Sequence, residues 1–317
     1  MKNNIDLSVI IPYSEKLRFE PVENIYKIYK QALDSTGLQY EFIFVINGNS
    51  GIMNNVYRAL CALVEGGEKI RIIKLAKTFG EGTVLSLAFE NSLGNKILTL
   101  PPYEQIIPEE IPKLITALED VDMIVARRTP RIDSWINRLQ SGIFHYLIGF
   151  RSDFRFHDLG CSVRAFKRRI IDKVFLYGEQ HRFFPILVQR YGYHVTEIPV
   201  IQSPKDDFQR IYPLVTYLRR FTDIISVFFL VKFTQKPLRF FGILGLFTFF
   251  LGVLLAGYLF VQRMFMGVAL ADRPLLLFDL LLFVGSVQLF AIGLIGEIII
   301  FTHAKDLKDY TIEKIIN

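Results

Sequence analysis

The sequence predicts an α/β domain followed by a membrane part, and three observations carry this prediction. As far as residue 126, short apolar segments alternate with helical segments, a pattern typical of a mostly parallel, doubly wound sheet flanked by helices. After residue 239 come two long apolar stretches with few or no charges. The hydrophobic share of 51% is also high for a purely soluble domain.

The first part of the chain contains five predicted strands. They are short, rich in Ile, Val and Phe, and mostly apolar on both faces, as strands of a covered parallel sheet are. They are Leu7–Ile11, Glu41–Ile46, Ile70–Leu75, Ile97–Leu100 and Met123–Ala126. The helical segments between them are Pro21–Thr36, Met53–Val64, Gly80–Ser92 and Pro108–Leu118. Sheets of this kind bind ligands beyond the carboxyl ends of their strands, so we expect the site in the loops that follow these strands.

Residues 127–200 are predicted to continue the domain. The pattern indicates a helix over Asp133–Ile148, an irregular stretch over Phe156–Phe166, helices over Lys167–Phe175 and His181–Tyr191, and a strand over His194–Val200. Between residues 125 and 173 there are eleven lysines and arginines against four aspartates, a local charge of +7 in a chain of net charge +6. Such a segment suits phosphate groups or an anionic membrane surface, and the alternative is a solvated helix face. Nucleic acid is disfavoured because no zinc-finger, RRM or helix-turn-helix pattern is present.

The remainder of the chain is predicted to associate with a membrane. Tyr217–Thr234 is basic, aromatic and amphipathic, which favours a helix in the membrane interface, although a core helix of the soluble domain is the alternative. Phe240–Val261 contains 22 residues without a charge, enough to cross about 30 Å of hydrocarbon. Leu275–Phe301 is a second span, with Asp279 and Glu297 near its ends, where pairing or snorkelling is expected.

The distribution of basic residues predicts the orientation of these spans. Five lysines or arginines precede the first span and three follow the second, whereas the connecting loop holds Arg263 and Arg273. The positive-inside rule therefore predicts an inner-membrane protein with two spans, whose α/β domain and two termini are cytoplasmic. The predicted organisation is a domain over residues 1–212, an interfacial helix and linker over 213–239, a transmembrane hairpin over 240–301 and a tail over 302–317.

Several motifs occur in an order that points to one family. LSVIIPYSE at residues 7–15, YEFIFV at 40–45 and IKLAKTFG at 73–80 resemble the first three strands and loops of family 2 glycosyltransferases. Residues 127–144 are similar to the arginine-rich segment of that family, and FHDLGCSVRAF at 156–166 is similar to its acceptor-side motif. HRF at 181–183 and the paired spans, which end in Gly296-Glu297, resemble the polyprenyl-phosphate hexosyltransferase branch, typified by dolichyl-phosphate mannose synthase.

The resemblance implies a Rossmann-like GT-A domain that moves a sugar from a nucleotide-sugar to a polyprenyl phosphate of the undecaprenyl type, for glycosylation of cell-envelope glycan or lipid. An acceptor phosphate is largely anionic at neutral pH, so its reaction needs positioning and charge compensation rather than a strong base. Guanidinium groups match phosphate oxygens. We therefore expect Asp158, Arg164 and Arg128 to be catalytic and Arg127 and Arg182 to bind the acceptor phosphate, although any one arginine is also explained by a surface ion pair and Asp158 by a turn.

The donor side follows the family less closely. The resemblance places six residues in the donor pocket: Pro12, Tyr13, Glu15, Asn47, Lys77 and Tyr103. The second strand is expected to end in Asp-Asp-Gly-Ser, and here it ends in Ile46-Asn47-Gly48-Asn49-Ser50. The Asn47 amide both donates and accepts hydrogen bonds, so base recognition in an altered form is expected.

The largest departure follows the fourth strand. The family carries an Asp-x-Asp site there for Mg²⁺ or Mn²⁺, and this chain has Pro101, Pro102 and Tyr103. Proline and tyrosine do not supply the anionic oxygens that such ions prefer. A relocated site at Glu104, Glu109 and Glu110 is one alternative, but these residues also suit the entrance of a helix. Replacement of the metal by arginine or lysine is another.

Two classes of function remain open from the sequence. The first is a membrane-anchored glycosyltransferase, whose partners are a nucleotide-sugar, a polyprenyl phosphate and the membrane, with self-association of the two spans into a homo-oligomer. The second is a catalytically inactive pseudoglycosyltransferase that acts as a binding or partner subunit, because both acidic motifs are lost together. A transporter is disfavoured because carboxylates near the span ends provide no polar site at the membrane midplane.

Overall fold

The computed structural model describes residues 5–15, 19–130, 156–174, 176, 180–206, 237–267 and 274–303. The chain divides into two compact units, the first formed by residues 1–227 with 310–317 and the second by residues 228–309. The predicted helix over Asp133–Ile148, the interfacial helix over Tyr217–Thr234, the boundary at residue 212 and the C-terminal tail lie outside the described residues.

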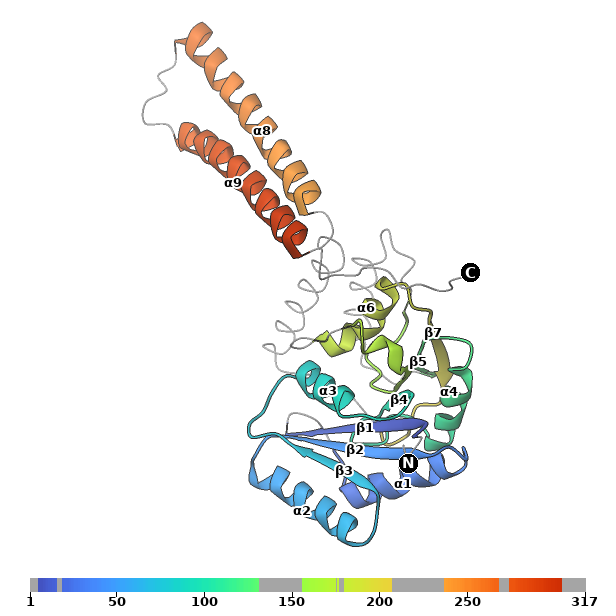
Figure 1. Cartoon of the computed structure of the whole chain (residues 1–317). Coiled ribbons are helices and arrows are strands. Elements are labelled where there is room, and N and C mark those ends of the chain that lie inside the picture. Colours follow the sequence, from blue (N-terminus) through green and yellow to red (C-terminus); the bar gives the residue numbers. More distant parts are fainter. Residues whose placement is uncertain are drawn as a thin grey trace. The chain divides into compact units, whose positions relative to one another are not determined.

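The first unit is built on a seven-stranded sheet with the order β3-β2-β1-β4-β6-β5-β7 (Figure 1). Six strands run parallel to one another, and β6 pairs antiparallel with β4 on one side and β5 on the other. The strands are β1 (Leu7–Ser14), β2 (Tyr40–Asn47), β3 (Ile70–Lys74), β4 (Lys96–Thr99), β5 (Met123–Arg128), β6 (Arg164–Lys167) and β7 (Val195–Val200). This arrangement confirms the predicted mostly parallel α/β sheet, and β1 to β5 and β7 confirm the predicted strands.

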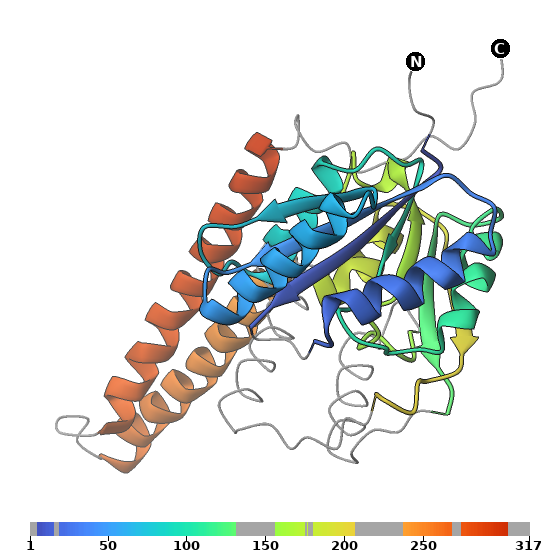
Figure 2. The same ribbon diagram turned by 90° about the horizontal axis from the view of Figure 1, so that it is seen from below.

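Helices cover both faces of this sheet, and Figures 1 and 2 show them from two directions. They are α1 (Val22–Asp34), α2 (Gly51–Glu65), α3 (Glu81–Glu90), the short 3-10 turn η1 (Pro108–Glu110), α4 (Ile111–Ala117), η2 (Arg168–Ile170), η3 (Gln180–Phe183) and α6 (Phe184–Arg190). The Ser50 hydroxyl caps α2 by accepting a hydrogen bond from Met53 N at 3.3 Å. The predicted helices over residues 21–118 are confirmed as α1 to α3 and as η1 with α4.

The alternation of side chains along the strands builds two cores. Odd-numbered residues of β1, such as Val9 and Ile11, belong to the core cluster that also contains Ile25 and Tyr29 of α1 and Leu60 of α2. The opposite face holds an aromatic cluster, in which Phe89 of α3, Phe166 of β6 and Phe184 of α6 lie with ring centroids 5.2–5.9 Å apart. Both faces are therefore covered, as the apolar runs predict.

Three predictions in the second half of this unit are wrong in detail. The irregular stretch over 156–166 ends in strand β6, because Arg164–Phe166 pairs with β4 and β5 on both sides. The helix over Lys167–Phe175 is the single turn η2 followed by irregular backbone. The helix over His181–Tyr191 begins as η3, and α-helix starts at Phe184, with Pro185 in its first turn.

The amino edge of the sheet is closed by a compact polar contact. Ser8 Oγ donates to Glu41 Oε1 at 2.7 Å and accepts a hydrogen bond from Gly94 N at 2.8 Å. A Cβ atom added at Gly94 would lie 2.5 Å from Ser8 N, so glycine is required for the loop to approach β1 this closely. This edge lies opposite the loops that are expected to bind ligand.

The second unit is a hairpin of two long helices, α8 (Pro237–Met266) and α9 (Pro274–His303). Both are long and apolar enough to cross a membrane, with a mean hydropathy of 2.3 in each. They pack closely at small residues, since a Cβ at Gly245 would lie 3.0 Å from the Ser286 carbonyl oxygen. Glu297 Oε2 accepts a hydrogen bond from Leu238 N at 3.3 Å, which satisfies an open donor at the start of α8, so the expected pairing of Glu297 is confirmed. Asp279 is 7% exposed, and among the described residues its buried Oδ1 has no hydrogen-bond partner, so the pairing expected there is not seen for this oxygen.

Candidate functional site

The carboxyl ends of six parallel strands and the start of β6 meet at one edge of the sheet. The parallel register carries β1 to Ser14, β2 to Asn47, β5 to Arg128 and β7 to Val200 at this edge. The antiparallel register places Arg164 of β6 opposite Thr99 of β4 and Val125 of β5. All the sequence-predicted site residues therefore lie in or next to this edge, which is where sheets of this kind bind ligands.

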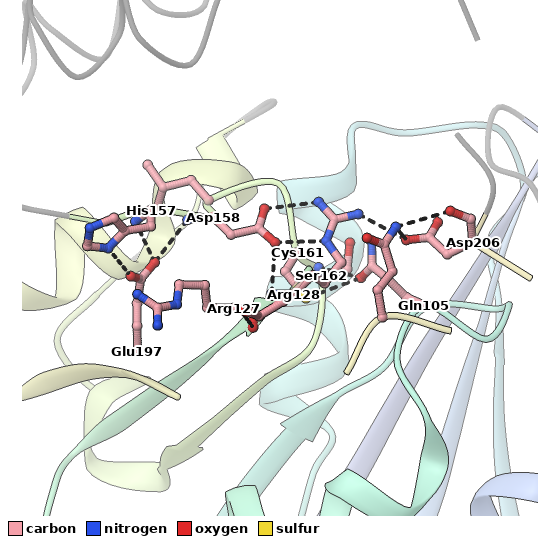
Figure 3. A network of polar contacts seen from close by, with 12 residues as sticks. Gln105, Arg127, Arg128, His157, Asp158, Cys161, Ser162, Glu197 and Asp206 are labelled. Atoms are coloured by element: carbon pink, nitrogen blue, oxygen red, sulfur yellow. Dashed lines mark hydrogen bonds and ion pairs between the residues drawn. The ribbon is translucent and has the colours of Figure 1, made fainter. Parts of the chain in front are cut away.

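Arg128, the last residue of β5, is held by two buried carboxylates (Figure 3). Its Nε and Nη2 donate to Asp158 Oδ2 and Oδ1 at 2.7 and 2.9 Å, and its Nη1 donates to Asp206 Oδ2 at 3.0 Å. The side chains of Arg128, Asp158 and Asp206 are 5%, 1% and 0% exposed. Among the described residues, one guanidinium therefore serves two buried carboxylates, which makes the arginine important to the cluster.

Two glutamines tie this cluster to the neighbouring loops. Gln202 Nε2 donates to Asp206 Oδ2 at 2.8 Å, which links the segment after β7 to the carboxylate. Gln105 Oε1 accepts a hydrogen bond from Ser162 N at 2.8 Å, which links the loop after β4 to the loop before β6. Burial raises the pKa of the neighbouring Cys161 thiol to about 12, so this thiol stays protonated and inert at neutral pH.

Glu197 of β7 fixes the loop that carries Asp158. Its Oε1 accepts hydrogen bonds from His157 N at 2.7 Å and Asp158 N at 3.0 Å, and its Oε2 lies 2.8 Å from His157 Nδ1. The Arg127 side chain lies beside Glu197 (Figure 3), and within the described part of the chain its buried Nε has no hydrogen-bond partner. Asp158 is therefore positioned through its own backbone as well as through Arg128.

Arg164, at the start of β6, donates hydrogen bonds to backbone carbonyls. Its Nη1 reaches His181 O, and its Nη2 lies 3.3 Å from both Leu159 O and Arg182 O. Burial lowers the pKa of Arg164 to about 10, which leaves it protonated at neutral pH. The side chain therefore joins the loop of residues 156–163 to η3, and Arg182 presents an exposed side chain beside it.

The same region is tied to the start of α3 by an ion pair. His181 Nε2 contacts Glu81 Oε2, and both side chains are largely buried. Burial alone raises the pKa of Glu81, but the hydrogen bond to His181 and the charges of His181, Arg182 and Arg164 outweigh this effect and lower it below its usual range. The pair links the β3–α3 connection to η3.

On the other side of the edge, the loops after β1, β2 and β3 converge. The Asn47 side chain is 1% exposed and pairs with backbone, since its Oδ1 accepts from Phe79 N at 2.8 Å and its Nδ2 donates to Phe79 O at 2.9 Å. Gly48 has a φ of 129°, and a Cβ there would lie 3.1 Å from Thr78 Oγ1 and 3.4 Å from Glu15 Oε1. Lys77 is exposed beside them, with its Nζ 5.2 Å from the Phe79 ring centroid.

Two predicted donor residues point into the protein. Tyr13 is fully buried, and its hydroxyl donates to Glu20 O at 3.4 Å. Tyr103 is 8% exposed, and its hydroxyl accepts a hydrogen bond from Gln105 Nε2 at 3.2 Å. Pro12 is partly exposed on β1. Glu15 and Lys77 are the predicted donor residues with exposed side chains at this edge.

The loop after β4 does not fit a divalent metal ion. The Tyr29 hydroxyl lies 3.1 Å from Pro101 O and 2.9 Å from Tyr103 O, so α1 holds the loop closed, and residues 101–106 are buried. Glu104 carries the first carboxylate after the strand, and it pairs with Lys205 Nζ. Glu109 and Glu110 lie in η1, and within the described ranges no three His, Cys, Asp or Glu side chains gather closely enough to bind a metal. We therefore derive no step through a metal at this loop.

Five polar residues of this edge were missed by reasoning from the sequence: Gln105, Glu197, Gln202, Lys205 and Asp206. Each is a single polar residue whose partner, except in the Gln202–Asp206 pair, lies far away in the sequence. The one available signal was Ser203-Pro204-Lys205-Asp206 directly after a predicted strand, because such loops lie at the carboxyl edge.

Comparison with known proteins agrees with this fold and with the hairpin. The family model "Glycosyl transferase family 2" matches residues 8–175, and "GtrB C-terminal hairpin" matches residues 236–300. The chain is 28% identical over 310 residues to dodecaprenyl-phosphate galacturonate synthase of Rhizobium johnstonii, covering 96% of this chain and 90% of that protein. It is 31% identical over 319 residues to undecaprenyl-phosphate 4-deoxy-4-formamido-L-arabinose transferase of Proteus mirabilis, covering 98% and 94%.

A solved structure shares the fold. Glucosyl-3-phosphoglycerate synthase of Mycobacterium tuberculosis, in complex with Mn²⁺, UDP and phosphoglyceric acid, superposes with a TM-score of 0.51 at 14% identity. The match covers 72% of this chain and 78% of that chain. The first unit supplies the sheet of this fold, and the family model spans more than half of the chain. The chain therefore belongs to glycosyltransferase family 2.

Proposed function

We propose that this protein is a membrane-anchored glycosyltransferase that moves a sugar from a nucleotide-sugar onto a polyprenyl phosphate of the undecaprenyl type. The product would serve glycosylation of cell-envelope glycan or lipid. One observation carries the proposal: over nearly its full length, the chain matches relatives named as polyprenyl-phosphate sugar transferases, and it combines the family 2 domain with the same hairpin model.

The chemistry of the edge supports transfer to a phosphate. The acceptor is already anionic at neutral pH, so positioning and charge compensation are the main requirements. We propose that Arg127 and Arg182 contact the acceptor phosphate, because their side chains are partly or fully exposed at this edge. Arg128, Asp158 and Arg164 are buried and bonded, so we propose that they act by positioning the loops that carry these contacts.

The donor is proposed to bind where the loops after β1, β2 and β3 converge. Glu15 and Lys77 offer exposed side chains, and Gly48 leaves room between them. Three buried side chains would support this pocket without reaching its surface. The side chain of Asn47 bonds to the backbone of Phe79, that of Tyr13 to the backbone of Glu20, and that of Tyr103 to the side chain of Gln105. Pro12 is partly exposed near the carboxyl end of β1.

The proposal is tested by turnover. Purified full-length protein in detergent is mixed with a panel of nucleotide-sugars and undecaprenyl phosphate, and transfer of labelled sugar to the lipid phase is measured. We expect one donor to yield a lipid-linked sugar and free nucleoside diphosphate in equal amounts. Arg182→Ala is expected to lower transfer by about tenfold through a higher KM for the lipid, because the substitution removes one charge-assisted phosphate contact.

A second candidate function is favoured by the closed loop at Pro101–Tyr103, which lacks the family's acidic motif. A pseudoglycosyltransferase would give no transfer with any donor and would instead retain a lipid-linked sugar or co-purify with an active transferase. Absence of transfer across the panel would therefore overturn the proposed activity.

We further propose that the first unit and both termini face the cytoplasm of an inner-membrane protein, because the loop between the two spans is poor in basic residues. Cysteine is introduced at Ile316 in the tail or at Ala271 in the loop between α8 and α9. In intact cells an impermeant thiol reagent is expected to label Ala271→Cys and to spare Ile316→Cys until the cells are opened. The reverse labelling would contradict this orientation.

A further inference from the structure

We propose that the ammonium group of Lys205 takes the place of a divalent metal ion at the carboxyl end of β4, so that this chain transfers sugar without a metal. The inference rests on the proposed function and deepens it, because it names the group that stabilises the departing nucleoside diphosphate. Where the family has metal-binding carboxylates, this chain has a buried Pro-Pro-Tyr loop. Lys205 contacts Glu104, the residue that follows this loop.

The fold brings Lys205 to this place from the far end of the sheet. The segment after β7 turns back along the loop after β4, where Ile107 N donates to Ile201 O at 3.1 Å and Ser203 N donates to Gln105 O at 3.2 Å. An isolated bridge between Ile106 and Gln202 lies between these contacts. Lys205 is thereby carried beside Glu104, although about a hundred residues separate them in the sequence.

The position of Lys205 resembles that of a bound cation. Its Nζ contacts Glu104 Oε1, and Glu104 N donates to Glu20 Oε1 at 3.3 Å, which holds the Glu20 carboxylate against the backbone of the same loop. The hydrogen bond that Lys205 donates to Glu104, followed by the negative charges of Glu104 and Glu20, raises the pKa of Lys205, which keeps it charged at neutral pH. Glu104 is 11% exposed and the lysine side chain is 54% exposed, so the carboxylate anchors the ammonium while solvent still reaches it.

This geometry gives the ammonium a chemical role. In the transfer, an acceptor phosphate oxygen forms a bond to the anomeric carbon, and the bond from that carbon to the donor diphosphate oxygen breaks. The electron pair stays on the diphosphate, which gains one negative charge. An ammonium has three N–H donors, so Lys205 can keep Glu104 and still donate to a phosphate oxygen, a compensation that requires no metal.

The test compares metal dependence in the wild-type protein and in Lys205 variants. Transfer with the donor identified by the panel is measured in EDTA and in Mn²⁺, and UDP binding is measured by calorimetry under the same conditions. For the wild type we expect transfer and UDP affinity to be the same in EDTA and in Mn²⁺. In EDTA, Lys205→Ala is expected to have a kcat/KM about 10²–10³-fold lower than the wild type. This is the size of loss that removal of one group stabilising a developing negative charge produces.

Rescue separates this role from a structural one. Removing Lys205 takes away the ammonium that faces Glu104, so Mn²⁺ is expected to take its place and to restore about tenfold of the lost activity and UDP affinity in Lys205→Ala. Lys205→Arg is expected to retain chelator-insensitive transfer because it keeps the charge. The matched control is Lys30→Ala, which breaks a Lys–Glu ion pair of 2.6 Å with Glu68 and is expected to leave both measurements unchanged.

Three results would overturn the inference. They are loss of wild-type transfer in EDTA, a Lys205→Ala protein that transfers as well as the wild type, and a loss in Lys205→Ala that Mn²⁺ fails to restore. Failure of the proposed function is a different result, because no protein in the series would then transfer sugar. In that case UDP binding still decides whether Lys205 contacts a diphosphate.

Discussion

Replacing Arg128 by methionine is expected to destabilise the first unit by about 3–5 kcal/mol, the range measured when one partner of a buried ion pair is removed. The reason is the charge balance of its cluster. Asp158 and Asp206 are at most 1% exposed, and both accept hydrogen bonds from the Arg128 guanidinium. Without it, both buried carboxylates lose the guanidinium that they share. Urea unfolding of the detergent-solubilised protein, followed by circular dichroism, measures the loss.

A second variant tests whether charge is the cause. Asp206→Asn in the Arg128→Met background removes one of the two buried charges, so we expect it to recover part of the stability, although Asp206→Asn alone is expected to destabilise. Arg182→Met, at an exposed arginine of the same edge, is the control and is expected to change stability by less than about 0.5 kcal/mol. If Arg128→Met costs no more than this control, the cluster does not depend on the ion pairs described here.

Much of the fold was predictable because its signals are local. Strands β1 and β2 are apolar on both faces, and such runs bounded by turn residues indicate a covered parallel strand. The two long apolar helices were predictable for the same reason, since length and composition define them. Strand β6 was missed because it has four residues, begins with Arg164 and is defined by the two strands that flank it.

The site was only partly predictable, because its geometry depends on contacts between distant segments. Asp158, Arg128 and Arg164 were identified from motifs, and the structure brings the first two into contact. Their partner Glu197 is a single acidic residue within β7 and carries no local signal, and Asp206 is marked only by its place in a loop that follows a predicted strand. The exposure of each arginine was also not readable from sequence, and it decides between phosphate contact and a positioning role.

Contacts with distant residues explain how the Pro101–Tyr103 loop, which replaces the family's acidic motif, fits into the edge. The sequence shows the loss of carboxylates but not the lysine that arrives from residue 205. The loop is closed by Tyr29 of α1 and by Gln105, so it is an ordered part of the edge. Because burying an unpaired carboxylate is costly, the Lys205 ammonium compensates the largely buried Glu104 carboxylate in this loop.

Replacing Asp158 by asparagine is expected to lower kcat for sugar transfer by about 100-fold, the size of effect that small misplacements of reacting groups produce. Asparagine has nearly the same shape, but it lacks the charge and one acceptor oxygen, so it cannot hold both Nε and Nη2 of Arg128. The loop bearing Asp158 is still fixed to Glu197 through its backbone. The loss is therefore expected in kcat, with a smaller change in the KM for the nucleotide-sugar.

The opposite edge of the sheet provides a matched control for this variant. Asp122 is also buried and also held by an arginine. Its Oδ1 accepts a hydrogen bond from Arg169 Nε at 2.8 Å, and its Oδ2 accepts one from His194 N at 3.0 Å. Asp122 lies at the amino ends of the strands, away from the site. Asp122→Asn is expected to reduce stability by a similar amount and to leave kcat unchanged. Equal losses of kcat in the two variants would show that Asp158 acts only through stability, whereas a loss confined to Asp158→Asn would establish that the Arg128–Asp158 contact positions the groups that react.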